Sequence, residues 1–219
     1  MIIPALDAAS SIAAVVKDAR RILPWVLVID DGSSDDTSAA ARAAGAQVIR
    51  HEMNRGKGGA LKTGFARALD DRLEAVITVD ADGQHLPSEI PKFLGEWGES
   101  QPDLAIGSRD HLFEQMLPRR RMANRFSAWT ISACAGTRVG DSQSGFRLYS
   151  RRLLQEVPIG ANGFDYESEI IVRAGRGGYK VLSVPIDLGF VNGISTSHYR
   201  PVKDTLRIAW TVARTRFVG

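Results

Sequence analysis

Short runs rich in valine and isoleucine alternate with helix-like segments through the first half of the chain. The runs lie at residues 2–3, 25–31, 46–51 and 75–80, and each is followed by a segment that can form a helix. A helix between two strands usually leaves them parallel, joined by a right-handed crossover. The order therefore predicts an α/β fold with a mostly parallel, Rossmann-like central sheet flanked by helices, which are expected at 10–19, 37–44, 54–71 and 88–96.

The second half of the chain has a less regular pattern. Apolar runs predict further strands at 104–109, 146–150 and 179–186, and helices are expected at 121–135, 166–174 and 202–216. A chain of 219 residues is long enough for one sizeable domain with a full core. We therefore expect a single domain over 1–219, with a nucleotide-binding half at 1–109 and a mixed acceptor half at 110–219.

Composition excludes several classes of protein. Hydrophobic residues make up 44% and charged residues 24% of the chain, as in ordinary globular proteins. The single cysteine, Cys134, excludes an intrachain disulfide and a multi-cysteine zinc site, and its apolar neighbours favour a buried hydrophobe over a nucleophile. No apolar run reaches the roughly 18 residues of a spanning helix, and the opening MIIPALD predicts a strand and loop instead of a signal peptide. We expect a cytoplasmic location.

The net charge is only +3, but basic residues are concentrated in two clusters, at Arg119–Arg121 and between Arg200 and Arg216. Such clusters suit phosphate-rich ligands or anionic surfaces. The sequence has neither an aromatic platform interleaved with basic residues nor a recognition-helix signature. We therefore expect no nucleic-acid partner.

The strand at 75–80 ends in two acids, Asp80 and Asp82, within AVITVDADGQH. Neighbouring carboxylates repel each other unless a cation, a donor or water compensates them. The pair could belong to a polar turn that caps the next helix. It could instead form a divalent-metal site at the carboxyl edge of the sheet, where open α/β folds bind their ligands. Taken alone, the Asp-x-Asp pattern leaves both interpretations open.

Two further segments combine glycine with charged residues. NRGKGGALKTG does not fit the Walker pattern, so its glycines could serve close packing at a helix start, while Lys57 remains a candidate diphosphate contact. In VIDDGSSDDT, Asp30 and Asp31 are either turn and cap residues or acceptors for a nucleobase or ribose. Neither segment decides the function by itself.

Arg109 and Arg147 each lie beside small residues, in GSR and in DSQSGFRLYSR. A lone arginine is usually a surface residue. Two arginines in small-residue loops of one α/β domain fit phosphate clamping better, because guanidinium binds phosphate in bidentate fashion.

Taken in order, these segments resemble the inverting family 2 glycosyltransferases with a GT-A fold, most of all the dolichyl- and polyprenyl-phosphate mannosyl- or glucosyltransferases. The resemblance covers nearly the whole chain. It rests on IIPALD, VIDDGSSDDT, NRGKGGALKTGF, VDADGQH, GSR, DSQSGFRLYSR and FDYESEIIVRA. It implies a metal-dependent enzyme that moves a hexose from a GDP- or UDP-linked sugar to a polyprenyl or dolichyl phosphate or another lipid, at the inner face of the membrane.

The resemblance also implies roles for individual residues. The cofactor would be Mg²⁺ or Mn²⁺, which neutralises the departing nucleoside diphosphate while the acceptor oxygen attacks in line. On the donor side it assigns metal binding to Asp80, Asp82 and Gln84, base recognition to Asp31 with Pro4 and Leu6, and donor contacts to Lys57, Asp80 and Arg109.

On the acceptor side the resemblance implies that Asp141 is the base or the acceptor-orienting group, that Arg147 lies near phosphate, and that Glu169 is the acid of the following helix. Two departures limit the inference. Asp7 and Ala8 stand where the family usually has Asn-Glu, so the base and sugar stay open. Ser197 and Arg200, in GISTSHYRPVKD, stand in a loop where the family often has Ser-Lys, which makes the acceptor less secure than the donor.

Two other functions compete with this one. A sugar-nucleotide pyrophosphorylase would need a glycine-rich N-terminal fingerprint that is absent. A nucleotide-sugar-binding protein without activity would have no need for the intact Asp80–Asp82 pair and Arg147.

The C-terminal helix predicted at 202–216 is amphipathic, with a basic stripe beside an apolar one. It could lie on an anionic membrane surface or pack on the domain. The apolar stripe consists of Val202, Leu206, Ala209, Ala213 and Phe217.

Overall fold

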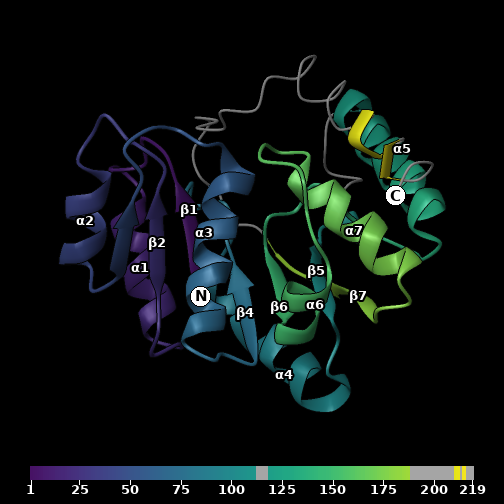
Figure 1. Cartoon of the computed structure of the whole chain (residues 1–219), viewed down its shortest axis with the longest axis horizontal. Coiled ribbons are helices and arrows are strands. Elements are labelled where there is room, and N and C mark those ends of the chain that lie inside the picture. The colour runs from purple at the N-terminus through teal and green to yellow at the C-terminus, as the bar shows by residue number, and fades with distance from the viewer. Residues whose placement is uncertain (112–117, 188–209, 213, 216–219) are drawn as a thin grey trace.

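The computed structural model describes residues 1–111, 118–187, 210–212 and 214–215 (Figure 1). Its centre is a seven-stranded sheet in the order β3-β2-β1-β4-β6-β5-β7. The strands are β1 (Ile2–Ala5), β2 (Leu27–Asp30), β3 (Gln47–Arg50), β4 (Ala75–Thr78), β5 (Leu104–Ser108), β6 (Arg147–Ser150) and β7 (Val181–Pro185). The helices are α1 (Ile12–Arg20), α2 (Thr37–Ala43), α3 (Lys57–Asp70), α4 (Ile90–Ser100), α5 (Pro118–Ala135), α6 (Arg151–Glu156) and α7 (Tyr166–Arg176), with a 3₁₀ turn η1 (Pro87–Glu89) before α4.

Strand β6 is antiparallel to both of its neighbours, whereas the other strand pairs are parallel. Arg147, the first residue of β6, pairs with Thr78 of β4 and with Ile106 of β5. The amino end of β6 therefore lies at the carboxyl edge of the parallel strands. The expectation of a mostly parallel sheet with a mixed second half is confirmed, and the loop before β6 joins the loops that follow β4 and β5.

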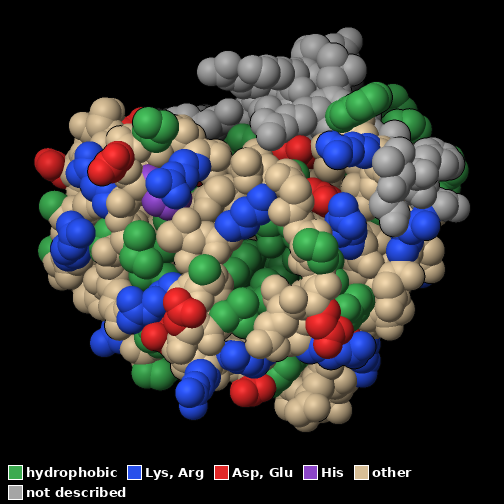
Figure 2. Space-filling view, viewed as in Figure 1, with side chains coloured by type: hydrophobic (Ala, Val, Ile, Leu, Met, Phe, Trp, Pro, Cys, Tyr) green, Lys and Arg blue, Asp and Glu red, His purple; other side chains and the backbone are tan. Residues whose placement is uncertain are grey.

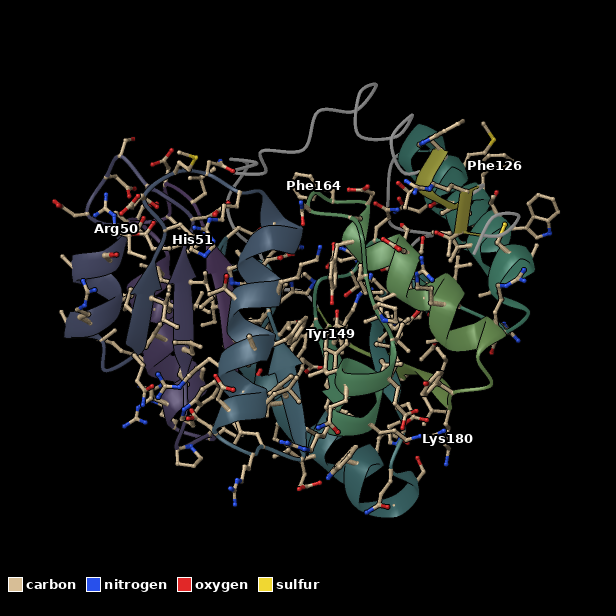
Figure 3. All side chains as sticks on the ribbon, in the orientation of Figure 1. Arg50, His51, Phe126, Tyr149, Phe164 and Lys180 are labelled. Atoms are coloured by element: carbon tan, nitrogen blue, oxygen red, sulfur yellow. The ribbon has the colours of Figure 1, made fainter. Side chains whose placement is uncertain are left out.

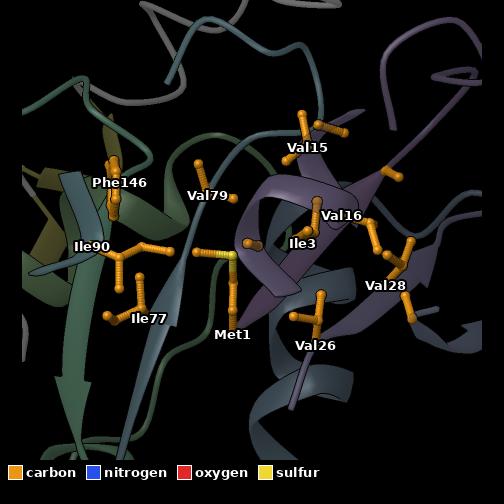
Figure 4. Close-up of a cluster of buried hydrophobic side chains, with 14 of the residues drawn as sticks. Met1, Ile3, Val15, Val16, Val26, Val28, Ile77, Val79, Ile90 and Phe146 are labelled. Atoms are coloured by element: carbon orange, nitrogen blue, oxygen red, sulfur yellow. The ribbon is translucent and has the colours of Figure 1, made fainter. Parts of the chain in front are cut away.

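The core has two parts because neighbouring residues of a strand point to opposite faces of the sheet. Ile3 packs with Val15 and Val16 of α1 in a cluster that also contains Phe146 (Figure 4). Ile2 points the other way, into a cluster with Phe65 of α3 and with residues of α6 and α7. The helices therefore cover both faces of the sheet and leave its carboxyl edge to the loops.

Several helix boundaries differ from the sequence-based expectation by a few residues, among them the start of α3 at Lys57 and the start of α5 at Pro118. The helix predicted at 88–96 is preceded by η1 and continues to Ser100 as α4. Helix α6 was not predicted. It begins where the Oγ of Ser150 accepts a hydrogen bond from the backbone N–H of Leu153 (3.0 Å), so Ser150 is a normal N-cap that directly follows a strand.

Only the end of the predicted C-terminal helix is described. Residues 210–212 and 214–215 are helical, and Val212 belongs to the same buried cluster as α7. The Oγ1 of Thr211 donates to Asp165 (2.9 Å), which holds this turn on the domain. The apolar stripe predicted for this helix falls on residues outside the described part of the chain, as do Ser197 and Arg200. Among the described helices, none is long and apolar enough to cross a bilayer.

Candidate active site

Charged side chains from five segments meet at the carboxyl edge of the sheet. The topology of the sheet brings these side chains together. Strands β4 and β5 end at this edge, β6 begins there, and the first turns of α3 and α7 lie beside it. We call this group the edge cluster. It consists of Lys57, Asp80, Asp82, Arg109, Asp141 and Glu167.

Lys57 is the central cation of the edge cluster. Its Nζ lies 2.6 Å from Oδ1 of Asp80 and 3.1 Å from Oε1 of Glu167. Burial lowers the pKa of Lys57, but the two carboxylates outweigh this effect and the net pKa is raised. For Asp80 the balance is similar: burial raises its pKa, and Lys57 more than reverses the change, so the net pKa is lowered. Lys57 and Asp80 are therefore both charged near neutral pH.

Among the described residues, no cation forms an ion pair with Asp82 as Lys57 does with Asp80. Burial and then the charge of Asp80 raise the pKa of Asp82, although its carboxylate accepts a hydrogen bond from the backbone N–H of Gln84 (3.0 Å). The pair therefore carries a negative charge that Lys57 only partly compensates. A divalent cation placed between Asp80 and Asp82 would relieve this repulsion.

Among the described residues, no three acidic, histidine or cysteine side chains are placed so that together they could hold one metal ion. Two carboxylates still fit Mg²⁺ or Mn²⁺, because such ions commonly take one or two protein carboxylates and complete their shell with water and substrate phosphates. The space beside Asp80 is tightly defined: a Cβ added to Gly145 would come within 2.4 Å of its Oδ2. The side chain of Gln84 is partly exposed here, and its role as a ligand stays a prediction.

Arg109 pairs with Asp141, and their Nε and Oδ2 atoms are 2.5 Å apart. Burial lowers the pKa of Arg109, and the carboxylate of Asp141 outweighs it, so the net pKa is raised. The other oxygen of Asp141 accepts a hydrogen bond from the backbone N–H of Gln143 (3.0 Å). A carboxylate held on both oxygens is suited to orienting a neighbour more than to removing a proton.

In the structure the guanidinium of Arg147 is engaged by the protein backbone, and the phosphate contact expected for it stays a prediction. Its side chain is fully buried, and its guanidinium donates to the backbone carbonyls of Ser144 (2.7 Å), Glu167 (2.7 Å) and Ser142 (2.9 Å). All three nitrogens are thus used inside the protein. Arg147 holds the loop before β6 against α7, and its Nε also lies 3.9 Å from Oε1 of Glu167 in the edge cluster.

Glu169 is also placed differently from its predicted catalytic role. It accepts hydrogen bonds from the backbone N–H groups of Gly160 and Ala161 and pairs with Arg173, so it anchors the loop before α7. The acid of this helix that reaches the edge cluster is Glu167, which the sequence analysis missed. The two residues are separated by about 200° around the helix, so only one could face the site, and FDYESE does not say which.

Asp31 is nearly fully buried and already has several donors. Its carboxylate accepts hydrogen bonds from the N–H groups of Arg55 (2.9 Å) and Gly56 (2.8 Å) and lies 2.6 Å from Nδ1 of His51. It therefore ties the glycine loop before α3 to the end of β2; Gly56 has φ of +84° there, a conformation that favours glycine. Base recognition by Asp31, together with the partly exposed Pro4 and Leu6, stays a prediction.

His85 is a second residue that the sequence analysis did not single out. It lies three positions after Asp82, is only 3% exposed, and has its Nδ1 3.9 Å from Oδ2 of Asp80. Burial lowers the pKa of His85 to about 4. Its ring is therefore neutral near pH 7 and carries one N–H.

Sequence comparison agrees with this geometry. Residues 1–158 match the family Glycosyl transferase family 2. The chain is 32% identical over 200 residues to the polyprenol monophosphomannose synthase of Mycolicibacterium smegmatis, covering 85% of this chain and 75% of that protein. It is 28% identical over 209 residues to the UDP-N-acetylglucosamine–dolichyl-phosphate N-acetylglucosaminyltransferase of Methanococcus voltae, covering 85% and 83%.

Structure comparison identifies the same fold in a solved protein. The glucosyl-3-phosphoglycerate synthase of Mycobacterium tuberculosis, crystallised with Mn²⁺ and UDP-glucose, superposes with a TM-score of 0.69 at 23% identity. The match covers 98% of this chain and 76% of that one. The GT-A fold expected from the resemblance is confirmed.

Proposed function

Because the chain belongs to glycosyl transferase family 2, we propose that it transfers a hexose from a nucleoside diphosphate sugar to a polyprenyl or dolichyl phosphate. The observation that carries the proposal is the edge cluster, in which the Asp80–Asp82 pair lies with two partly buried cations, Lys57 and Arg109, at the carboxyl edge of the sheet. Acids for a metal and cations for a diphosphate are what this reaction requires.

Asp80 and Asp82 are the residues that would hold Mg²⁺ or Mn²⁺. The solved relative crystallised with Mn²⁺ and UDP-glucose supports this assignment. When bound, the cation supplies neutralisation of the negative charge on the leaving diphosphate. Lys57 and Arg109 add positive charge from the protein side, and Arg109 does so from a fixed position because Asp141 holds its guanidinium.

The acceptor proposal rests on the relatives and on Asp141. Both named relatives act on polyprenyl or dolichyl phosphates. A phosphate acceptor is already anionic and needs little help from a base, which agrees with an Asp141 that is paired with Arg109. In this proposal Asp141 and Arg109 orient the acceptor phosphate, and the segment 110–219 forms most of the acceptor side.

The proposal is tested by incubating the protein with Mn²⁺, a short-chain polyprenyl phosphate and a panel of UDP- and GDP-hexoses. We expect one donor to give a glycosyl polyprenyl phosphate with inverted anomeric configuration, detected by mass spectrometry and NMR. Donor binding without transfer or hydrolysis would instead identify a non-catalytic binding protein. Formation of a nucleotide sugar from a nucleoside triphosphate and a sugar phosphate would identify a pyrophosphorylase.

We also propose a peripheral membrane contact, which a lipid-linked acceptor requires. In the described part of the chain, six large hydrophobic side chains are exposed, and four of them lie on α5 and in the C-terminal turn beside it (Figures 1 and 2). Met122, Phe126 and Trp129 have helical spacing on one face of α5, with exposed fractions of 71%, 67% and 67%, and Trp210 is 71% exposed. Figure 3 shows Phe126 pointing away from the domain.

Basic residues occur in the same two segments. The first turn of α5 contains Arg119, Arg120 and Arg121, and the exposed Arg214 follows Trp210 by one helical turn. Aromatic side chains beside basic residues are typical of helices that lie in the interface of an anionic bilayer.

Replacing Phe126 and Trp129 together by serine is therefore expected to weaken binding to anionic vesicles by about tenfold or more, since tenfold corresponds to about 1.4 kcal/mol of lost apolar burial. Co-sedimentation at low and high salt measures the effect. The matched control is Leu94→Ser on α4, at the other end of the molecule, which should bind as wild type does. Unchanged binding by the double variant would exclude this surface.

A further inference from the structure

His85 is held in one orientation by aromatic packing. Its ring lies edge-on to Phe146, with centroids 6.0 Å apart and planes at 88°. Phe146 in turn stacks on Phe93 of α4 at 4.6 Å and 9°. Because the imidazole is buried and fixed, its two nitrogens face defined neighbours.

One nitrogen of His85 faces the loop before β6. The Nε2 lies 3.4 Å from Oγ of Ser144, and that oxygen accepts a hydrogen bond from the backbone N–H of Phe146 (3.3 Å). The hydroxyl of Ser144 keeps its own hydrogen, which can be donated to Nε2. The carboxylate of Asp80 lies on the Nδ1 side and favours the tautomer whose proton is on Nδ1, because that N–H then faces an acceptor.

The other nitrogen is left without a partner. Within the part of the chain that the structure describes, Nδ1 of His85 makes no hydrogen bond. An unpaired buried donor costs roughly 1–3 kcal/mol, so such a group usually indicates an interaction made in another state of the protein. Its nearest acidic atom is Oδ2 of Asp80, at 3.9 Å, about 1 Å beyond hydrogen-bonding distance.

Asp80 is placed to make this bond. Its Oδ1 is the atom that pairs with Lys57, whereas its Oδ2 faces both His85 and the backbone of Gly145. Gly145 is also bound to the end of β4, because the Oγ1 of Thr78 donates to its carbonyl (2.9 Å). A small movement of the Asp80 carboxylate is therefore sufficient to join it to His85.

We propose that His85 is a positioning residue that joins the carboxylate of Asp80 to the loop 141–146 when a divalent cation binds. This inference rests on the proposed function. With a cation held by Asp80 and Asp82, Oδ2 of Asp80 would accept the Nδ1–H of His85 while Nε2 kept its contact with Ser144. In this proposal His85 links the metal-binding carboxylate on the donor side of the site to the loop that contains Asp141. Hydrogen bonds to a ligating carboxylate typically change metal affinity 10- to 100-fold.

Two isosteric variants of His85 distinguish the hydrogen bond made by Nδ1 from the one made by Nε2. The amide nitrogen of His85→Asn occupies the place of Nδ1, and the amide of His85→Gln occupies that of Nε2. We expect Asn to keep the dissociation constant for Mn²⁺ within about threefold of wild type and Gln to raise it about tenfold or more. The measurement is electron paramagnetic resonance of Mn²⁺ with UDP and, separately, with GDP, so no turnover is needed.

The control variant is Phe93→Leu, which removes the aromatic stack on Phe146 and leaves Asp80, His85 and Ser144 unchanged. It should lower Tm and leave the affinity for Mn²⁺ unchanged. Equal Mn²⁺ affinity of His85→Gln and wild type would overturn the inference. An equal loss in both His85 variants, with a fall in affinity for Phe93→Leu as well, would assign His85 a purely structural role. If wild type bound no Mn²⁺ with either nucleotide, the proposed function would fail first and this inference with it.

Discussion

Asp82→Asn is expected to lower kcat/KM for sugar transfer by about a thousandfold, and EDTA should abolish turnover of the wild type. Metal stabilisation of a leaving diphosphate contributes several kcal/mol, and each 1.36 kcal/mol is a factor of ten in rate. The loss should occur without loss of folding. The folded-state pKa of Asp82 is raised, so its ionised form disfavours the fold as pH rises through that pKa, and a neutral asparagine should keep or increase Tm at pH 7 in the absence of metal.

A matched control for this prediction is Asp103→Asn. Asp103 is a buried carboxylate at the other edge of the sheet, where it accepts hydrogen bonds from Ser150 (3.0 Å) and from the backbone of Lys180 (3.0 Å). This variant should lose stability and keep its metal dependence. Steady-state kinetics with added Mn²⁺ and thermal unfolding measure both effects. Full activity of the wild type in EDTA would contradict the metal assignment.

Arg147→Lys is expected to lower the free energy of unfolding by about 3 kcal/mol, because it disrupts a buried charged group that is fully hydrogen-bonded. A lysine ammonium cannot reproduce a planar fork that reaches three carbonyls. Activity should also fall at temperatures where the variant is folded, since the loop at 142–144 loses its anchor. Urea unfolding and kinetics below Tm measure the two effects separately.

The control is Arg152→Lys, five residues along the chain, whose side chain is 61% exposed. Exposed substitutions of this kind usually change stability by less than about 0.5 kcal/mol. If Arg147→Lys unfolded at the same urea concentration as wild type, the buried arrangement would be refuted and the phosphate-clamp interpretation would return.

The sequence predicted the strands and the edge where their ends meet, since alternation of apolar runs and helices requires parallel crossovers. Lys57, Asp80, Arg109 and Asp141, which the sequence analysis named as candidate site residues, lie together at this edge. The direction of side chains at the start of β6 and α7 was not predictable. Whether an arginine or glutamate faces a ligand or a neighbouring backbone depends on which carbonyls and N–H groups the folded loops present, as Arg147 and Glu169 demonstrate.

The antiparallel placement of β6 has a consequence for how such enzymes diversify. β5 and β6 are direct neighbours, and the N–H of Gly107 donates to the carbonyl of Phe146 (2.8 Å), so the segment between them leaves and re-enters the sheet at one hydrogen bond. The two ends of this connection are held close together by the sheet. The entropy cost of closing such a loop grows only slowly with its length, so the connection can change in length and sequence at little cost in stability. The segment also contributes the buried Ile131, Ala135 and Val139 to the core beside α7. If those three residues are kept, grafting the 110–140 segment of a relative is expected to transfer acceptor choice while the donor remains that of the host.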